Sequence, residues 1–128
     1  MSVAATASRG EASALEPIYV DAALLVLDKP SGLLAVPGRG PDKQDCLAAR
    51  AQTVYPDALV VHRLDMDTSG LMVMARGADA QRALSAAFAA RTVKKRYLAV
   101  VAGRLEAPSQ EWGSVDLPLV CDWPNRPR

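Results

Sequence analysis

The sequence has few cysteines, a single histidine, few aromatic residues and no long apolar segment. Two cysteines among 128 residues exclude a disulfide-rich scaffold, and we expect Cys46 and Cys121 to be reduced thiols. The longest uninterrupted apolar run, 22–27, is far shorter than the roughly 20 residues that cross a bilayer. We therefore expect a cytoplasmic protein with no membrane span, no metal and no cofactor.

Net charge is also nearly absent, because 15 Lys and Arg side chains are balanced by 14 Asp and Glu side chains, which gives +1. By itself that balance indicates no charged partner. The basic residues are nevertheless clustered, since residues 91–104 contain no acidic residue. The basic residues of this patch are Arg91, Lys94, Lys95, Arg96 and Arg104.

The remaining composition is that of one folded domain. Apolar residues make up 50% of the chain and charged residues 23%, which is typical of globular proteins. Residues 1–14 are rich in Ala, Ser and Thr and lack the apolar stretch of a secretory signal. We expect them to be a disordered leader before a domain that covers 15–128.

The hydrophobic pattern predicts several short strands and two helices. Two β-prone runs, 17–21 and 24–28, flank an Asp-Ala-Ala link and predict a hairpin. Apolar residues at helical spacing predict one helix between an N-cap at Asp45 and Pro56, and a second helix over 78–91, which the basic run 91–96 closes. Further extended segments are predicted at 33–36, 59–62, 71–75 and 97–102, and a loop at 38–42. This irregular mixture predicts the α+β class, with a mixed, mainly antiparallel sheet and flanking helices.

The densest polar cluster is residues 62–70, His-Arg-Leu-Asp-Met-Asp-Thr-Ser-Gly, which lies between two extended segments. Asp65 can serve there as a nucleophile or a general base, because it is anionic at neutral pH and His62 and Arg63 lie beside it. Asp, Thr, Ser and Gly are also the residues of an ordinary tight turn between strands. From the residues alone, the purely structural interpretation is the favoured one.

Other polar or reactive residues give weaker signals. A lone imidazole such as His62 is more often a hydrogen-bonded packing residue than a catalyst, and Cys46 is expected to pack within a helix. The glycines of 38–40 lack the spacing of a phosphate-binding loop, so no nucleotide cofactor is expected. Tyr97 follows the basic run 91–96, where cations can bind RNA phosphates and a ring can stack on a base. Helix ends are often basic without any ligand, so a solvent-exposed helix end remains the alternative interpretation of the basic run.

Four segments in order resemble a known family. They are D-K-P-S-G-L-L-A-V-P-G at 28–38, H-R-L-D-M-D-T-S-G-L at 62–71, K-K-R-Y-L-A-V-V at 94–101 and V-D-L-P-L-V-C-D-W-P-N-R-P at 115–127. Together they resemble the RluA-type pseudouridine synthases, which isomerise uridines in structured RNA such as the tRNA anticodon arm and large-subunit rRNA. The resemblance implies a pseudouridine synthase catalytic domain, RNA as the partner, no cofactor and no metal.

The resemblance also implies roles for individual residues. Asp65 corresponds to the catalytic aspartate, which attacks the target nucleotide while the uracil is detached, rotated and rejoined through carbon. Tyr97 corresponds to the tyrosine that lies against the uracil and takes the proton from its C5. Arg63 corresponds to the arginine that displaces the target base, a step that is needed because a stacked base cannot be reached. The other residues that we expect to contact RNA are His62, Thr68, Lys94, Lys95 and Arg96.

The pattern of the family continues beyond the end of this sequence. In members of the family, the segment that corresponds to residues 115–127 is followed by further strands. A basic residue that pairs with the catalytic aspartate and an apolar residue that packs against the uracil also follow it. We therefore expect 15–128 to be the N-terminal part of an incomplete catalytic domain, monomeric when complete. Two other hypotheses stay open, a non-catalytic RNA-binding remnant and a carboxylate-dependent hydrolase that is unrelated to RNA.

Overall fold

The computed structural model of the chain describes residues 15–106 and 112–120. It divides into two units, Met1–Lys95 and Arg96–Arg128, and every helix and strand of the described residues lies in the first. The expected leader lies outside the described residues. None of the helices described has both the length and the hydrophobicity that crossing a membrane requires.

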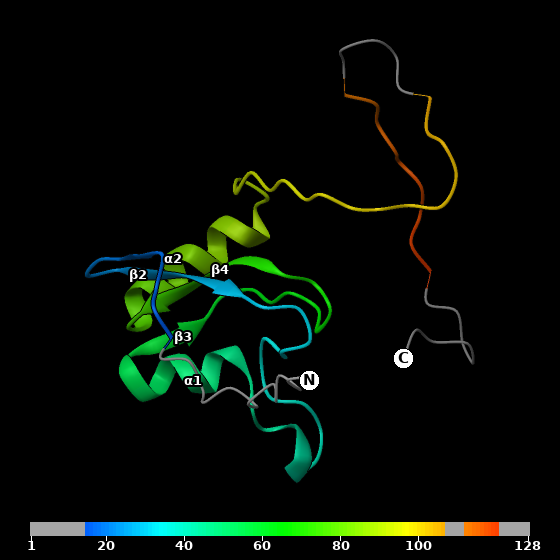
Figure 1. Cartoon of the computed structure of the whole chain (residues 1–128). Helices are drawn as coiled ribbons and strands as arrows, with labels where there is room; N and C mark the ends of the chain where they lie inside the picture. Colours follow the sequence, from blue (N-terminus) through cyan, green and yellow to red (C-terminus); the bar gives the residue numbers. More distant parts are fainter. Residues whose placement is uncertain (1–14, 107–111, 121–128) are drawn as a thin grey trace, which may run out of the picture. The chain divides into compact units, whose positions relative to one another are not determined.

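Four antiparallel strands form the sheet of the first unit (Figure 1). The order across the sheet is β1-β2-β4-β3, and the strands are β1 (Tyr19–Val20), β2 (Leu24–Lys29), β3 (Ala58–Val60) and β4 (Gly70–Arg76). β1 and β2 form the predicted hairpin. The carboxylate of Asp21 fixes its turn by accepting hydrogen bonds from the backbone N–H groups of Ala23 and Leu24, at 2.7 and 2.9 Å. β3 and β4 confirm the strands predicted at 59–62 and 71–75.

Two helices cover the two faces of this sheet, α1 (Leu47–Val54) on one and α2 (Ala78–Ala89) on the other (Figure 1). Both helices were predicted, but the N-cap of α1 is Cys46 and not Asp45. The Cys46 Sγ accepts a hydrogen bond from the backbone N–H three residues later, at 3.4 Å. The carboxylate of Asp45, one residue earlier, instead pairs with the guanidinium of Arg50 at 2.8 Å.

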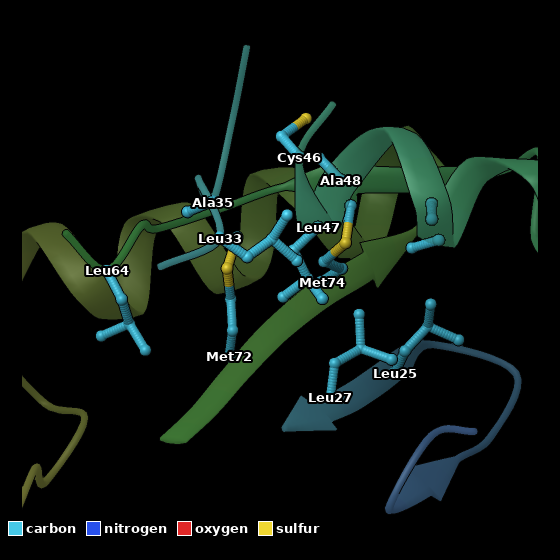
Figure 2. Close-up of a cluster of buried hydrophobic side chains, with 12 residues drawn as sticks. Leu25, Leu27, Leu33, Ala35, Cys46, Leu47, Ala48, Leu64, Met72 and Met74 are labelled. Atoms are coloured by element: carbon cyan, nitrogen blue, oxygen red, sulfur yellow. The ribbon is translucent and has the colours of Figure 1, made fainter. Parts of the chain in front are cut away.

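The hydrophobic core lies between α1 and one face of the sheet (Figure 2). Side chains alternate along a strand, so Leu25 and Leu27 of β2 point to the same face as their register partners Met74 and Met72 of β4. All four are fully buried, which contributes about 1.5–3 kcal/mol each. The core is completed by Leu33, Ala35, Cys46, Leu47, Ala48, Ala51, Ala58 and Leu64. A polar side chain on this face therefore needs a hydrogen-bonding partner inside the protein.

The C-terminus of α2 is a Schellman motif. The N–H of Thr92 donates to the carbonyl of Ala87 and the N–H of Arg91 donates to the carbonyl of Phe88, both at 3.1 Å. Arg91 has φ 57°, in the left-handed region that usually holds glycine. The prediction that 91–96 closes the helix is therefore corrected, because the last helical turn has no basic residue and the basic run begins after it.

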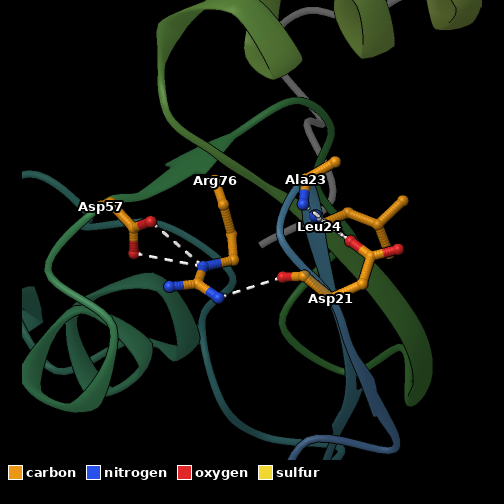
Figure 3. A network of polar contacts seen from close by, with 5 residues as sticks. All are labelled: Asp21, Ala23, Leu24, Asp57 and Arg76. Carbon is orange, nitrogen blue, oxygen red and sulfur yellow. Dashed lines mark hydrogen bonds and ion pairs between the residues drawn. The ribbon is translucent and has the colours of Figure 1, made fainter.

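The end of β4 that lies farthest from residues 62–70 is fastened by Arg76 (Figure 3). Its Nε donates to the carboxylate of Asp57 at 3.1 Å, and its guanidinium also donates to the backbone carbonyl of Asp21 at 3.0 Å. The same guanidinium lies 5.5 Å from the ring centroid of Tyr55. Arg76 therefore joins β4 to the β1–β2 turn and to the connection between α1 and β3.

Two of the predicted extended segments are not strands. Residues 33–36 form only an isolated parallel bridge between Leu34 and Cys46, and the loop before α1 contains one 3-10 turn, η1 (Pro41–Lys43). Residues 97–102 are exposed and form neither helix nor strand. An extended pattern specifies which side chains alternate, but a strand forms only where a neighbour supplies hydrogen bonds.

Candidate active site

Arg63 and Asp65 lie in the connection between the end of β3 and the start of β4. The N–H of Thr68 donates to the carbonyl of Asp65 at 3.1 Å and closes a turn over residues 65–68, which we call the Asp65 turn. The side chains of Arg63 and Asp65 are exposed, whereas Leu64 between them is buried in the core. Burial of Leu64 therefore leaves the predicted nucleophile and the predicted base-displacing cation accessible to a substrate.

A buried lysine holds the Asp65 turn. Lys29 takes the core-facing position of β2 that follows the two buried leucines, and it is 0% exposed. Its ammonium donates to the backbone carbonyls of Pro30 at 3.0 Å, Leu33 at 2.6 Å and Met66 at 2.9 Å. An ammonium has three protons and can be buried only where they find acceptors, and these carbonyls satisfy all three. Lys29 therefore ties the end of β2 to the middle of the Asp65 turn.

The charge of Lys29 also acts on the turn. Burial lowers the pKa of Lys29 from its ordinary value of 10.5, and the carboxylates of Asp67 and Asp65 oppose that shift. Both carboxylates are therefore within electrostatic reach of the ammonium. The sequence thus places one buried positive charge behind a turn that carries two exposed negative charges.

Two more hydrogen bonds join the segment after β2 to the Asp65 turn. The N–H of Gly32 donates to the carbonyl of Met66 at 2.8 Å, and the Ser31 hydroxyl donates to the carbonyl of Asp67 at 2.7 Å. Gly32 has φ 89°, a conformation that side chains rarely adopt. Residues 29–32 and 65–68 therefore form one hydrogen-bonded assembly, although they are far apart in the sequence.

His62 is held inside the first unit by two contacts. Its Nε2 accepts a hydrogen bond from the backbone N–H of Val73 at 2.9 Å, and its ring stacks on Phe88 with centroids 4.4 Å apart and planes at 18°. Burial and, to a smaller degree, the charge of Lys95 lower the pKa of His62. The neutral imidazole is the form that can accept the hydrogen bond. That His62 contacts RNA stays a prediction.

The other predicted RNA contacts divide between the two units. Lys94 and Lys95 are exposed after the end of α2, and the charge of Lys95 contributes to the lowered pKa of His62. Arg96 and Tyr97 belong to the second unit, where both are exposed and Arg96 lies 5.3 Å from a Trp112 ring centroid. The role of Tyr97 beside Asp65 stays a prediction, as does that of the half-buried Thr68.

Sequence interpretation missed Lys29 and Ser31 as residues that position the site. A signal was available, because Lys29 occupies a core-facing position in an alternating strand, where an unpaired lysine is almost never found. The turn Lys29-Pro30-Ser31-Gly32, which ends the extended run in the sequence, begins at this same lysine. Which carbonyls the ammonium binds could not be read from the sequence, since the partner at Met66 is 37 residues away.

Both segments of this assembly fall within a family match. A family model described as RNA pseudouridylate synthase matches residues 23–126. The chain belongs to the RNA pseudouridylate synthase family. The matched residues include 29–32, the Asp65 turn and Tyr97.

Curated relatives match most of the chain. The dual-specificity RNA pseudouridine synthase RluA of Vibrio vulnificus is 53% identical over 112 residues, which are 88% of this chain and 44% of the relative. RluA of Escherichia coli K12 is 50% identical over 111 residues, 87% of this chain and 49% of the relative. The solved structure of human RNA Pseudouridylate Synthase Domain Containing 4 is 28% identical with a TM-score of 0.47, and covers 59% of this chain and 30% of that one. The chain thus spans about half the length of the RluA proteins, and its sheet and two helices are part of a pseudouridine synthase domain.

Proposed function

We propose that this chain carries the nucleophile of an enzyme that isomerises uridine to pseudouridine in structured RNA. One observation supports the assignment most directly, namely that the exposed carboxylate of Asp65 lies on a turn whose backbone is held by Lys29, Ser31 and Gly32. Fixing a nucleophile before the substrate arrives removes much of the entropic cost of attack. Family membership supplies the reaction class, and the RluA relatives are named dual-specificity enzymes. The resemblance of the sequence motifs to RluA-type enzymes leads us to propose the tRNA anticodon arm, large-subunit rRNA or both as the target.

The proposed reaction begins when the Asp65 carboxylate attacks the target nucleotide and the bond between C1′ of the ribose and N1 of the uracil breaks. The uracil rotates, and a bond forms between C1′ and C5 while the bond between the nucleotide and Asp65 breaks, which releases the free carboxylate. The proton on C5 passes to the phenol oxygen of Tyr97 as the phenol releases its own proton to solvent. N1 receives a proton from solvent, so the product is an isomer of the substrate. A carboxylate and a phenol suffice for these steps, with no change of redox state.

The proposed RNA contacts come from both units of the chain. Arg63 is next to the Asp65 turn and is exposed, as a cation that displaces a base must be. Lys94, Lys95 and Arg96 bind phosphates, and Thr68 completes the contacts at the turn. In this proposal, residues 15–128 are the N-terminal part of the catalytic domain.

A single-turnover assay with a folded anticodon stem-loop tests the nucleophile. Pseudouridine leaves the mass unchanged and is detected by its reaction with carbodiimide. Asp65→Asn keeps the size of the side chain but removes the charge, and we expect no product above background. Asp67→Asn is the matched control, because it removes a second exposed carboxylate from the same turn and should retain product formation. Product formation by Asp65→Asn at the rate of the unmodified chain would refute the assignment.

A second candidate function is RNA binding without catalysis, which is favoured by the exposed cations Lys94, Lys95 and Arg96. This hypothesis predicts RNA association that weakens steeply with salt and no product from the unmodified chain. Charge reversal at Lys94 and Lys95 should then abolish association, whereas Asp65→Asn should leave it unchanged. A carboxylate-dependent hydrolase would instead be indifferent to the charge reversal.

A further inference from the structure

The ladder between β3 and β4 ends with an unusual hydrogen bond. β3 pairs with β4 from Ala58 to Val60, and continuing this register by one residue would place Val61 opposite Val73. The backbone leaves the sheet there. The N–H of Val73 instead donates to the Nε2 of His62 at 2.9 Å, so an imidazole takes the place of a strand carbonyl.

Packing determines where this imidazole lies. The ring of His62 stacks on Phe88 of α2, with centroids 4.4 Å apart and an angle of 18° between the planes. One side chain is thus held from two directions, by a helix through its face and by β4 through its nitrogen. Such a side chain has little freedom left, and neither has the backbone that carries it.

The two residues that follow His62 connect it to the site. Arg63 is the next residue and is exposed, and Leu64 is inserted into the core immediately before the Asp65 turn. Lys29, Ser31 and Gly32 hold the turn itself at Met66 and Asp67, which leaves its entry side to be held by Leu64 and His62. Nothing in the contacts of His62 requires RNA.

We propose that His62 is a positioning residue, whose hydrogen bond to Val73 and stacking on Phe88 fix the entry to the Asp65 turn and so set the placement of Arg63 and Asp65. The role differs from the substrate contact that the sequence suggested for this residue. The proposal that His62 is a positioning residue rests on the proposed function only in the experiment that measures turnover.

Amide hydrogen exchange on the free full chain provides a test that is independent of activity. His62→Phe keeps an aromatic ring for stacking but has no acceptor, and we expect the amides of Val73 and Thr68 to exchange about tenfold faster. His62→Gln restores an acceptor at a similar distance and should restore most of the protection of both amides. Phe88→Leu is the matched control, since it removes the stacked ring and keeps the acceptor, and it should leave Val73 more protected than His62→Phe does.

Turnover on the anticodon stem-loop is the second readout. For His62→Phe we expect kcat to fall about 10- to 100-fold with KM changed by less than about threefold, because a misplaced nucleophile slows the reaction without removing RNA contacts. His62→Gln should recover kcat. A rise in KM at unchanged kcat would overturn the proposal and identify His62 as an RNA contact. Faster exchange at Val73 alone, with Thr68 protected as before, would also overturn it. If the unmodified chain forms no pseudouridine, the proposed function fails and the exchange result still decides the role of His62.

Discussion

Lys29→Met tests whether the buried ammonium stabilises the Asp65 turn. Methionine preserves most of the volume of the side chain, so the change removes a charge and three hydrogen bonds without opening a large cavity. The carbonyl of Met66 keeps the hydrogen bond from Gly32 at 2.8 Å, and that of Pro30 keeps a long contact of 3.5 Å from the N–H of Leu33. Among the described residues, the carbonyl of Leu33 accepts only from Lys29, at 2.6 Å.

The expected loss of stability follows from this count. The carbonyl of Leu33 loses its partner, and a buried carbonyl without a partner costs about 1–3 kcal/mol. The other two lost hydrogen bonds cost less, because the variant no longer has to desolvate a buried ammonium. We expect the free energy of unfolding to fall by about 1–3 kcal/mol. Lys29→Ala should cost about 2–5 kcal/mol, because a cavity then adds to the lost hydrogen bonds.

Urea denaturation followed by circular dichroism measures both variants. The midpoint should move to lower urea while the slope stays the same, which is the sign of a change in stability alone. Lys43→Met is the control, since Lys43 is exposed and surface substitutions change stability by less than about 0.5 kcal/mol. If Lys29→Met were as stable as the unmodified chain or more stable, desolvation of the ammonium would outweigh its hydrogen bonds, and the inferred role of Lys29 in stability would be refuted.

Two further predictions concern the C-terminus of α2 and the turn of the β1–β2 hairpin. Arg91 has φ 57°, a conformation that costs glycine less than alanine. In urea denaturation, Arg91→Gly should therefore be about 1 kcal/mol more stable than Arg91→Ala, although both variants lose the charge. Equal stability of the two variants would contradict the left-handed conformation of Arg91. The pKa of Asp21 is lowered from 3.8 by the backbone N–H groups of Ala23 and Leu24 and by Tyr19. Its stabilisation is therefore present above 3.8 and is lost as the pH falls through the lower folded pKa. Thermal melting of Asp21→Asn should show a weaker decline over that acid range, and an unchanged decline would exclude this contribution.

The proposed active site depends on contacts between two segments that the chain order separates. Lys29 ends β2 and is followed by Ser31 and Gly32, at the same end of the sheet where the Asp65 turn precedes β4. The pairing of β2 with β4 brings them together, because Lys29 lies opposite Gly70 in the register. The sheet therefore does more than support the turn, since its register decides which carbonyls the buried ammonium can reach.

Much of the fold could be predicted from local patterns. Alternating apolar residues predicted the β1–β2 hairpin and β4, helical spacing predicted α1 and α2, and the cluster 62–70 with its family motifs indicated the candidate site. These features depend on residues near one another in the chain. The same local reasoning gave the wrong N-cap for α1, since the cap is Cys46 and the carboxylate of Asp45 pairs with Arg50 instead.

The sequence by itself determined which residue types are available for chemistry, where regular elements form and to which family the motifs point. Only the tertiary structure decided that 97–102 has no strand partner among the described residues, that Lys29 binds the carbonyl of Met66 and that His62 completes the end of a strand ladder. Periodicity specifies which face a side chain takes, whereas its partner depends on strand register and on chain segments brought together only by folding.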